Sequence, residues 1–335
     1  MIRRVAGSAA AAAIGLAAGA MAILLAGGNP VAAFAALVDG ALGSTHGWSE
    51  VAVKSCPLII TGLGVALAFR AGIWNIGAEG QLVAGALAAV WLGTRPLPIG
   101  AAIGVPLALG AAAIGGGLLA ALAAWLKSRR NVDEVISTIM LNFIVLGTIG
   151  YLVQGPLMEA AGRYPQSDAV LDFARLPRPF TGMRVHLGLL GALLLVPTAS
   201  YVLFATRYGY VVRAAGANPL AARIAGLPAQ RATFAAFVAS GALAGLAGGI
   251  EMTAVTHRMY ESFSPGYGYT AIAVALLGRL HPAGVLAAAL LFGILEAGSG
   301  SMQRVAGVSA GLVALIQAGV IFALAAIDYR GRGTA

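Results

Sequence analysis

Charged residues are scarce in this sequence: Asp, Glu, Lys and Arg make up 10% of its 335 residues, against about a quarter in soluble domains. The single cysteine, Cys56, excludes an internal disulfide and a zinc site built from several thiolates. The two lysines, Lys54 and Lys127, do not follow a glycine-rich phosphate loop, which excludes a nucleotide-hydrolysing site of that kind. The four histidines lack metal-ligand spacing, so we expect neither a catalytic nor a metal site.

Long apolar runs fill most of the chain, since 59% of the residues are hydrophobic and the mean hydropathy is +0.88. A bilayer core about 30 Å thick needs about 20 apolar residues per helix. These properties predict an all-α integral membrane protein with about ten transmembrane helices, of which the eighth is short enough to be re-entrant. We place the spans at residues 5–27, 52–69, 78–93, 98–126, 133–153, 186–206, 230–252, 268–279, 282–298 and 306–327.

The basic residues give a net charge of +9, yet most of them lie at the ends of apolar runs and do not cluster with aromatic residues. This pattern is typical of membrane orientation and not of nucleic-acid binding, and it predicts that both termini are cytoplasmic. The apolar stretch after Arg3 and Arg4 favours an uncleaved first helix over a signal peptide. Asn29 and Pro30 begin what we expect to be a short interfacial helix on the outer face, within residues 29–50.

A basic segment at residues 207–228 separates two apolar stretches. Asn218 can cap a helix N-terminus, Pro219 suits the first helical turn, and Gly226 can end the helix in the left-handed conformation. Together these residues predict one short helix at about 219–225.

The predicted short helix carries Leu220 and Ile224 on one face, with Arg223 beside them. An apolar surface next to a cation suits a groove on another protein better than a buried core. The alternative is that the segment only connects two membrane helices.

Polar residues inside predicted spans are costly in lipid and tend to face a cavity or another helix. Asn75, Glu79 and Gln81 lie in a glycine-containing stretch that cannot form one uninterrupted apolar helix. We therefore place them at a polar pathway through the membrane or at its inner gate. The alternative is a cytoplasmic helix cap in which Glu79 pairs with Arg70.

Thr138 and Asn142 lie four residues apart on the fifth predicted span, so they share a face that can hydrogen-bond a passing solute. Asn142 can instead join two helices, and Gln317 is a weaker pathway candidate. Near the outer ends of spans, four further residues are expected to face solvent or a docking partner: Glu251, His257, Glu261 and Glu296.

Three motifs lie in order along the chain. Residues 216–226, Gly-Ala-Asn-Pro-Leu-Ala-Ala-Arg-Ile-Ala-Gly, resemble the cytoplasmic coupling loop of permeases in ATP-binding-cassette (ABC) importers. Residues 75–81 and 131–142 resemble motifs of the nucleoside and simple-sugar branch of these permeases. Residues 268–278 resemble a third motif of the same branch. The resemblance runs from about residue 50 to 325.

The resemblance implies a single transmembrane permease domain over residues 1–335, of the type II-like architecture with broken or re-entrant helices. It contains a cytoplasmic coupling loop at 207–228 and an outer loop at 154–185. The subunit is expected to move a nucleoside or related small polar solute by alternating access. Its substrate pathway is expected to contain Asn75, Glu79, Gln81, Thr138 and Asn142. Coupling to the ATPase is expected to depend on Arg213, Gly216, Asn218, Pro219, Leu220, Arg223 and Gly226.

The resemblance also implies partners. Separate ATPase subunits bind the ATP and Mg, so we expect no cofactor in this chain and no enzyme activity of its own. A second permease subunit completes a heterodimer or a homodimer in the bacterial cytoplasmic (inner) membrane, among membrane lipid. An extracytoplasmic solute-binding lipoprotein docks on the outer loop, unless that loop is a passive connector. The alternatives are an ion-coupled secondary transporter, with Glu79 as its buried carboxylate, and an integral membrane enzyme.

Overall fold

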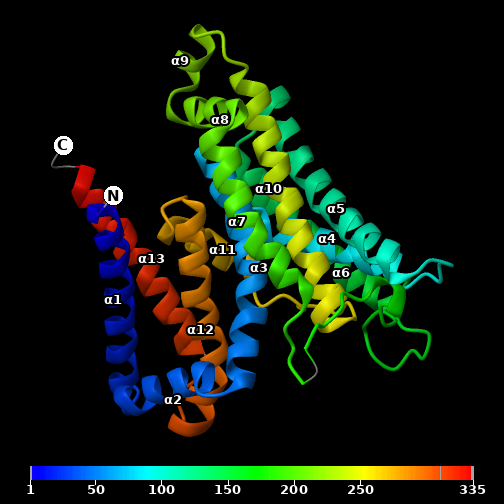
Figure 1. Ribbon diagram of the computed structural model, residues 1–335, viewed down its shortest axis with the longest axis vertical. Coiled ribbons are helices and arrows are strands. Elements are labelled where there is room, and N and C mark those ends of the chain that lie inside the picture. The colour runs from blue at the N-terminus through cyan, green and yellow to red at the C-terminus, as the bar shows by residue number, and fades with distance from the viewer. Residues whose placement is uncertain (1, 181, 310, 333–335) are drawn as a thin grey trace. The chain divides into compact units, whose positions relative to one another are not determined.

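The computed structural model describes residues 2–180, 182–309 and 311–332 (Figure 1). Helices dominate this part of the chain, and its β pairing is limited to one bridge between Gln166 and Tyr260. The all-α prediction is therefore confirmed. In chain order the elements are α1 (Ile2–Leu25), α2 (Pro30–Leu42), α3 (Thr45–Arg70), α4 (Ala78–Gly93), α5 (Ala101–Arg130), α6 (Glu134–Gln154), η1 (Asp172–Ala174), α7 (Leu187–Ala205), α8 (Arg207–Ala217), α9 (Pro219–Ile224), α10 (Ala229–Glu251), η2 (Met252–Thr256), α11 (Tyr267–Leu277), α12 (Pro282–Ala306) and α13 (Gly311–Arg332).

Seven helical segments in the described part of the chain are long and apolar enough to cross a membrane. The predicted spans at 78–93, 268–279 and 306–327 correspond to shorter apolar helices: α4 with 16 residues, α11 with 11, and the Gly311–Ala323 part of α13. The count of about ten is therefore not confirmed. The seven candidate spans are Gly7–Leu25, Thr45–Arg70, Ala101–Arg130, Glu134–Gln154, Leu187–Ala205, Ala229–Thr256 and Pro282–Ala306.

The ends of several helices differ from the predicted spans. The second span was placed at 52–69, but α3 begins already at Thr45. The ninth was ended at residue 298, but α12 continues to Ala306, where Gly307 with φ of 66° stops it. Both helices therefore extend beyond their apolar runs into neighbouring polar residues. The predicted helix after Asn29 is confirmed as α2, because the Asn29 side chain accepts hydrogen bonds from the first-turn backbone N–H groups at 2.9 and 3.2 Å.

The described residues form two compact units. The first comprises residues 1–55, 180–185 and 273–335, in which α1 packs on α13 and α2 packs on α12. Its core contains Ile23, Leu295 and Met302, all of them buried. Because lipid provides no hydrophobic driving force between helices, such pairs depend on close packing of small and apolar side chains.

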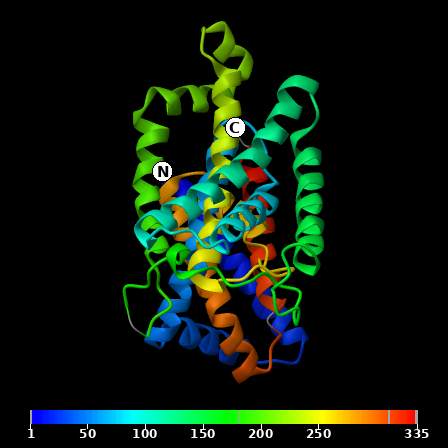
Figure 2. The ribbon, with the colours of Figure 1, turned by 90° about the vertical axis from the view of Figure 1, so that its right-hand side faces the viewer.

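The second unit comprises residues 56–179 and 186–272 and is organised around α10, which packs along α4 and α5 (Figures 1 and 2). Glycines make this contact close: a Cβ added to Gly116 of α5 would lie 2.7 Å from the backbone of Gly245 in α10. Glycine in this part of α5 thus lets the neighbouring helix approach closely. The candidate sites described below all lie within this second unit.

Candidate functional site

The basic segment folds into α8 and α9, which meet at Asn218. The Asn218 side chain accepts hydrogen bonds from the backbone N–H groups of Leu220 (3.1 Å) and Ala221 (3.0 Å). Gly226, with φ of 74°, follows the end of α9. The predicted helix at 219–225 is thus confirmed, because its capping depends only on residues next to it in sequence.

The surface of α9 is apolar and accessible. Leu220 is 66% exposed and Ile224 is 81% exposed, with the exposed Arg223 beside them. On the opposite side, Ala222 is buried. Neighbouring exposed apolar side chains are typical of a contact surface. The structure therefore places Leu220 and Arg223 where a partner can reach them, and the identity of that partner stays a prediction.

The predicted coupling residues in α8 face the protein. The guanidinium of Arg213 lies 5.2 Å from the ring centroid of Phe204, within cation–π range. Gly216 packs so tightly on Arg70 that a Cβ added to it would overlap the Arg70 carbonyl group. A Cβ added to Gly72 would in turn lie 3.1 Å from the Cα of Gly216. The C-terminal end of α8 thus touches the segment that links α3 to α4.

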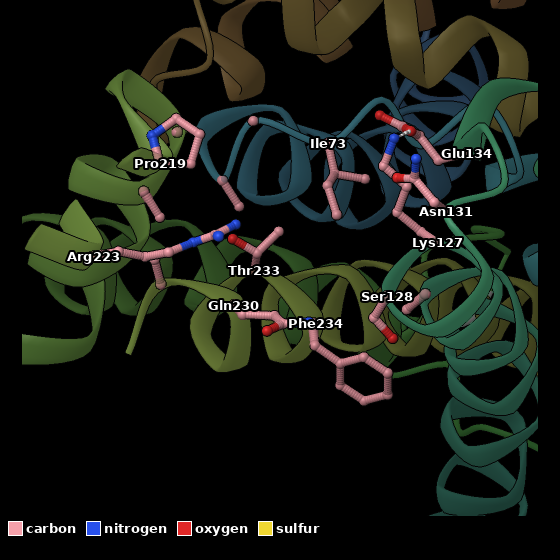
Figure 3. Close-up of a pocket in the computed structure, with 16 residues that line it drawn as sticks. Ile73, Lys127, Ser128, Asn131, Glu134, Pro219, Arg223, Gln230, Thr233 and Phe234 are labelled. Carbon is pink, nitrogen blue, oxygen red and sulfur yellow. Dashed lines mark ion pairs between the residues drawn. The ribbon is translucent and has the colours of Figure 1, made fainter. Parts of the chain in front are cut away.

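The chain leaves the helical conformation after Arg70 and resumes it at Ala78, as the glycines in this stretch predicted. Beside this break lies a cavity of about 390 Å³, which we name the coupling cavity (Figure 3). Its walls come from the break and from the ends of α5, α6, α8, α9 and α10 that meet there. On one wall Lys127 Nζ and Glu134 Oε2 form an ion pair of 2.7 Å. Figure 3 shows Arg223 extending toward Thr233 from another side.

Buried amides join the break to α4 and α10. The side chains of Asn75 and Gln81 exchange two hydrogen bonds, of 2.8 and 3.0 Å. Asn75 Nδ2 also donates to Ser240 Oγ at 2.9 Å, and Asn75 Oδ1 accepts from the backbone N–H of Gly77 at 3.1 Å. Asn75, Gln81 and Ser240 are each at most 1% exposed. Buried polar groups that satisfy one another in this way hold neighbouring elements in a fixed arrangement.

Asn142 of α6 continues this network. Its Oδ1 accepts from the backbone N–H of Gly80 at 2.9 Å, and its Nδ2 donates to the carbonyl of Ile76 at 3.0 Å. Thr138, one turn earlier and fully buried, donates to the carbonyl of Glu134 in its own helix at 2.7 Å. Both residues thus share the inward face of α6, as their spacing predicted. In this conformation Asn142 joins α6 to the start of α4, which was the alternative interpretation.

Glu79 binds the start of another helix. Its Oε2 accepts a hydrogen bond from the backbone N–H of Gly268 at 2.7 Å, and the carboxylate also accepts from the Ser264 hydroxyl and the Tyr269 backbone. A carboxylate at this position satisfies free donors at the N-terminus of α11 and interacts favourably with its dipole. Glu79 therefore caps α11. We name Asn75, Glu79, Gln81, Asn142 and Ser240 the polar cluster.

A second cavity, of about 360 Å³, lies farther along α6, and we name it the loop cavity. Its walls are Val83 of α4, residues of α6 from Phe143 to Ile149, and the segment 261–264 that precedes α11. Ser264 belongs both to this wall and to the set of donors around Glu79. The polar cluster and the loop cavity are therefore adjacent.

The outer loop is ordered against the segment after α10. Glu159 Oε2 accepts from Arg258 at 2.9 Å and from Gln166 at 2.8 Å, and Ser167 donates its backbone N–H to the Met259 carbonyl at 2.8 Å. The hydrogen bond from Gln166, with the nearby Arg258 charge, lowers the pKa of Glu159. The short helix η1 lies within this loop.

His257 follows the π-helical turn at the end of α10 and adopts a positive φ of 56°. Partial burial lowers its pKa, and the positive charges of Arg175 and Arg178 lower it further. Arg178 Nη2 lies 3.3 Å from His257 Nε2 and donates to the carbonyl of Ala254 at 2.6 Å. His257 is therefore part of the contact between loop and helix and is only partly open to solvent.

Several residues were misplaced or missed by sequence reasoning. Glu251 was expected to face solvent but is buried, with 6% exposed, because α10 ends inside the second unit. Ser240 was overlooked, although a serine within an apolar run is the same signal that identified Asn142. Gln317 belongs to the first unit, whereas the residues of the polar cluster belong to the second. Within the described residues, no three His, Cys, Asp or Glu side chains are grouped so as to hold a metal ion.

The described part of the chain is helical and contains seven helices long and apolar enough to cross a membrane, which defines a multi-pass membrane protein. Residues 47–325 match the family described as the permease component of branched-chain amino acid transport systems, and the chain belongs to this family.

Similar proteins are ABC permeases. TsgB13 of Haloferax volcanii, a glucose ABC transporter permease protein, is 38% identical over 94% of this chain and 85% of its own length. NupP of Bacillus subtilis, a guanosine ABC transporter permease protein, is 36% identical over 93% and 90%. NupQ, another guanosine permease protein of B. subtilis, is 28% identical over 73% and 78%. No solved structure matches the chain.

Proposed function

We propose that this chain is the membrane permease subunit of an ABC importer for a nucleoside or a sugar, and that the solute passes along α6. The family match makes the chain a permease component, and its relatives are named for glucose and guanosine. The main support for this pathway is that two cavities and the polar cluster follow one another along α6. Glu134 lies at the coupling cavity, Asn142 in the polar cluster, and Ile149 at the loop cavity. The family match argues against an ion-coupled transporter.

The polar cluster acts as the closed gate between the two cavities. Its hydrogen bonds join Asn75 to Gln81, and they join Asn142 to the backbone of the segment between them. Neither cavity is lined by these three side chains. A hydrogen bond contributes about 0.5–1.5 kcal/mol to stability in net terms. A few such bonds can therefore be exchanged for bonds to a solute when the helices move, which is what alternating access requires.

Only a few residues separate the proposed ATPase contact on α9 from the polar cluster. A partner ATPase binds the exposed side of α9, at Leu220 and Arg223, and displaces α8 with it. Gly216 at the end of α8 transmits this displacement to Gly72, because their backbones are in contact. Gly72 lies three residues before Asn75, so the movement reaches the polar cluster directly.

The partners follow from the family. Separate ATPase subunits bind ATP and Mg, and this chain contributes no cofactor of its own. B. subtilis has two different guanosine permease proteins, NupP and NupQ, and both resemble this chain. This supports a heterodimer of two permeases over a homodimer. The ordered outer loop offers a docking surface to an extracytoplasmic solute-binding lipoprotein.

The proposed setting is the bacterial cytoplasmic membrane, with both termini and α9 on the cytoplasmic side. Residues 1–335 act as one permease domain of the type II-like class. The shorter apolar helices α4, α11 and α13 bring the seven candidate spans to about ten crossings or re-entrant segments. The break before α4 and the capped start of α11 support this arrangement.

The proposal is tested by charge reversal on α9. Leu220→Asp and Arg223→Asp are each expected to reduce ATP-dependent uptake of labelled guanosine or glucose at least tenfold, because both side chains are exposed on α9, where the proposed ATPase contact lies. Copurification of the ATPase with the permease is expected to fall in parallel.

Arg231→Asp is the matched control, since Arg231 is also an exposed arginine of the second unit but lies on α10. It should retain most uptake. Normal uptake and normal copurification in both α9 variants would refute the coupling role. Uptake of neither solute by the unaltered complex would refute the solute assignment.

A further inference from the structure

The loop cavity has the size and the construction of a ligand site. Three elements build it: α4 through Val83, α6 through residues 143–149, and the segment 261–264. Its volume of about 360 Å³ falls within the range of about 300–1,000 Å³ typical of small-molecule sites. Ser262 adopts a φ of 60°, which is unfavourable for a residue other than glycine. Strained backbone of this kind concentrates at ligand sites.

The carboxylate of Glu261 is unused by the fold. Its neighbours in the outer region are all engaged: Glu159 binds Arg258, Asp172 binds Arg175, and Asp168 accepts from the backbone N–H of Ala160. Among the residues that the structure describes, no hydrogen bond or ion pair engages the Glu261 side chain. It is exposed beside α6, where a Cβ added to Gly150 would lie 3.6 Å from its carboxyl carbon. This acceptor is therefore available to a molecule in the cavity.

The other residues that line the cavity indicate which chemical groups a bound molecule can carry. Phe143 and Phe263 provide aromatic surface, while Ser262 and Ser264 provide hydroxyl groups. No lysine, arginine or histidine lines the cavity, so nothing there neutralises a phosphate, and Glu261 would repel it. An ionised carboxylate accepts hydrogen bonds only, which matches the two donors of a vicinal diol.

From this arrangement we infer that the loop cavity is the site that receives the sugar ring of the solute, with Glu261 accepting hydrogen bonds from neighbouring ring hydroxyls. The inference rests on the proposed function and narrows it to an unphosphorylated furanose or pyranose. Phe143 and Phe263 cover the apolar face of the ring or an attached base. Ser264 connects the site to the gate, because its hydroxyl also donates to Glu79 at the start of α11.

Cysteine labelling tests occupancy without requiring transport. The only native cysteine, Cys56, is fully buried, so a Ser262→Cys variant presents one accessible thiol. Membrane fragments open on both faces are treated with a small thiol reagent, with and without guanosine or glucose. At least one of the two is expected to slow labelling at position 262 at least threefold, whereas guanosine monophosphate is not.

The matched control is Ala161→Cys, which lies in the exposed outer loop and away from the cavity lining. Its labelling rate should not respond to any of the three compounds. Equal labelling of Ser262→Cys with and without both solutes would overturn the inference. Protection by guanosine monophosphate equal to that by guanosine would overturn the exclusion of phosphorylated solutes.

Uptake kinetics test the role of the carboxylate. Glu261→Gln is expected to raise KM by about tenfold for a solute with a vicinal diol, since a charged hydrogen bond is worth about this factor or more. The variant should also lose discrimination against the corresponding deoxy analogue, and Glu296→Gln should change neither property. An unchanged KM and unchanged discrimination in Glu261→Gln, while the unaltered chain supports uptake, would overturn this inference and leave the proposed function standing.

Discussion

The coupling cavity and the loop cavity are of similar size but opposite chemistry. The first is lined by Lys127, Glu134 and Arg223, two of them already joined in an ion pair. The second has no basic residue, two phenylalanines and a carboxylate without a partner. Charged pairs suit a protein surface that is matched to them, while aromatic rings with a free acceptor suit a neutral polar solute. This difference agrees with the proposed roles, in which one end of the second unit binds a protein and the other end a small molecule.

The polar cluster separates these two environments. Its side chains differ from both linings because they are buried and already hydrogen-bonded, either to one another or to the backbone of neighbouring segments. The comparison between the cavities therefore depends on this closed middle layer. Each of the following changes alters one part of the arrangement.

The largest effect is expected from Gly216→Val, at the contact between α8 and the break. A Cβ there would overlap the Arg70 carbonyl group, so α8 must shift away from the segment that leads to Asn75. Overpacking of this kind costs about 1–3 kcal/mol. We expect at least a tenfold loss of uptake while the complex still hydrolyses ATP, measured by parallel uptake and phosphate-release assays. Ala217→Val, at an exposed neighbouring position, should retain uptake; equal loss in both variants would contradict a specific role for the contact.

A smaller effect is expected from Asn75→Leu in the polar cluster. This change removes both hydrogen bonds to Gln81 and the one to Ser240, leaving buried polar groups without partners. The expected decrease in the free energy of unfolding is about 1–3 kcal/mol, measured by thermal unfolding in detergent. Adding Gln81→Leu should recover part of this loss, because the stranded amide is removed as well. Additive losses in the double variant would show that the two residues are not coupled.

The smallest effect is expected from acid at the outer loop. The pKa of Glu159 is lowered in the folded state, so its contribution to stability is present above the ordinary carboxyl value near 4.5 and is lost as pH falls through the folded value. Hydrogen exchange at the Ser167 and Met259 amides, corrected for intrinsic rates, should therefore be constant from pH 7 to 5 and accelerate below that. Glu159→Gln should exchange faster already at pH 7 and lack this pH dependence, and an unaltered profile in the variant would contradict the assignment.

Local features were predictable from sequence, and long-range ones were not. The helix α9 was predicted correctly because Asn218, Pro219 and Gly226 act on their immediate neighbours. The break before α4 followed from its glycines. The partner of Glu79 at Gly268 is 189 residues away, and no local pattern indicates it. The number of membrane crossings was likewise beyond reach, because helices as short as α11 are positioned by tertiary contacts and not by hydropathy.

The exposed side of α9 has a consequence for the chain on its own. Leu220 and Ile224 are apolar yet mostly accessible to water, and leaving each such side chain solvated forgoes about 1.5–3 kcal/mol relative to burial. If the ATPase covers α9 as proposed, a subunit made in excess over its ATPase leaves this apolar tip exposed to aggregation and proteolysis. Balanced synthesis of the two proteins would conceal that tip as soon as it emerges.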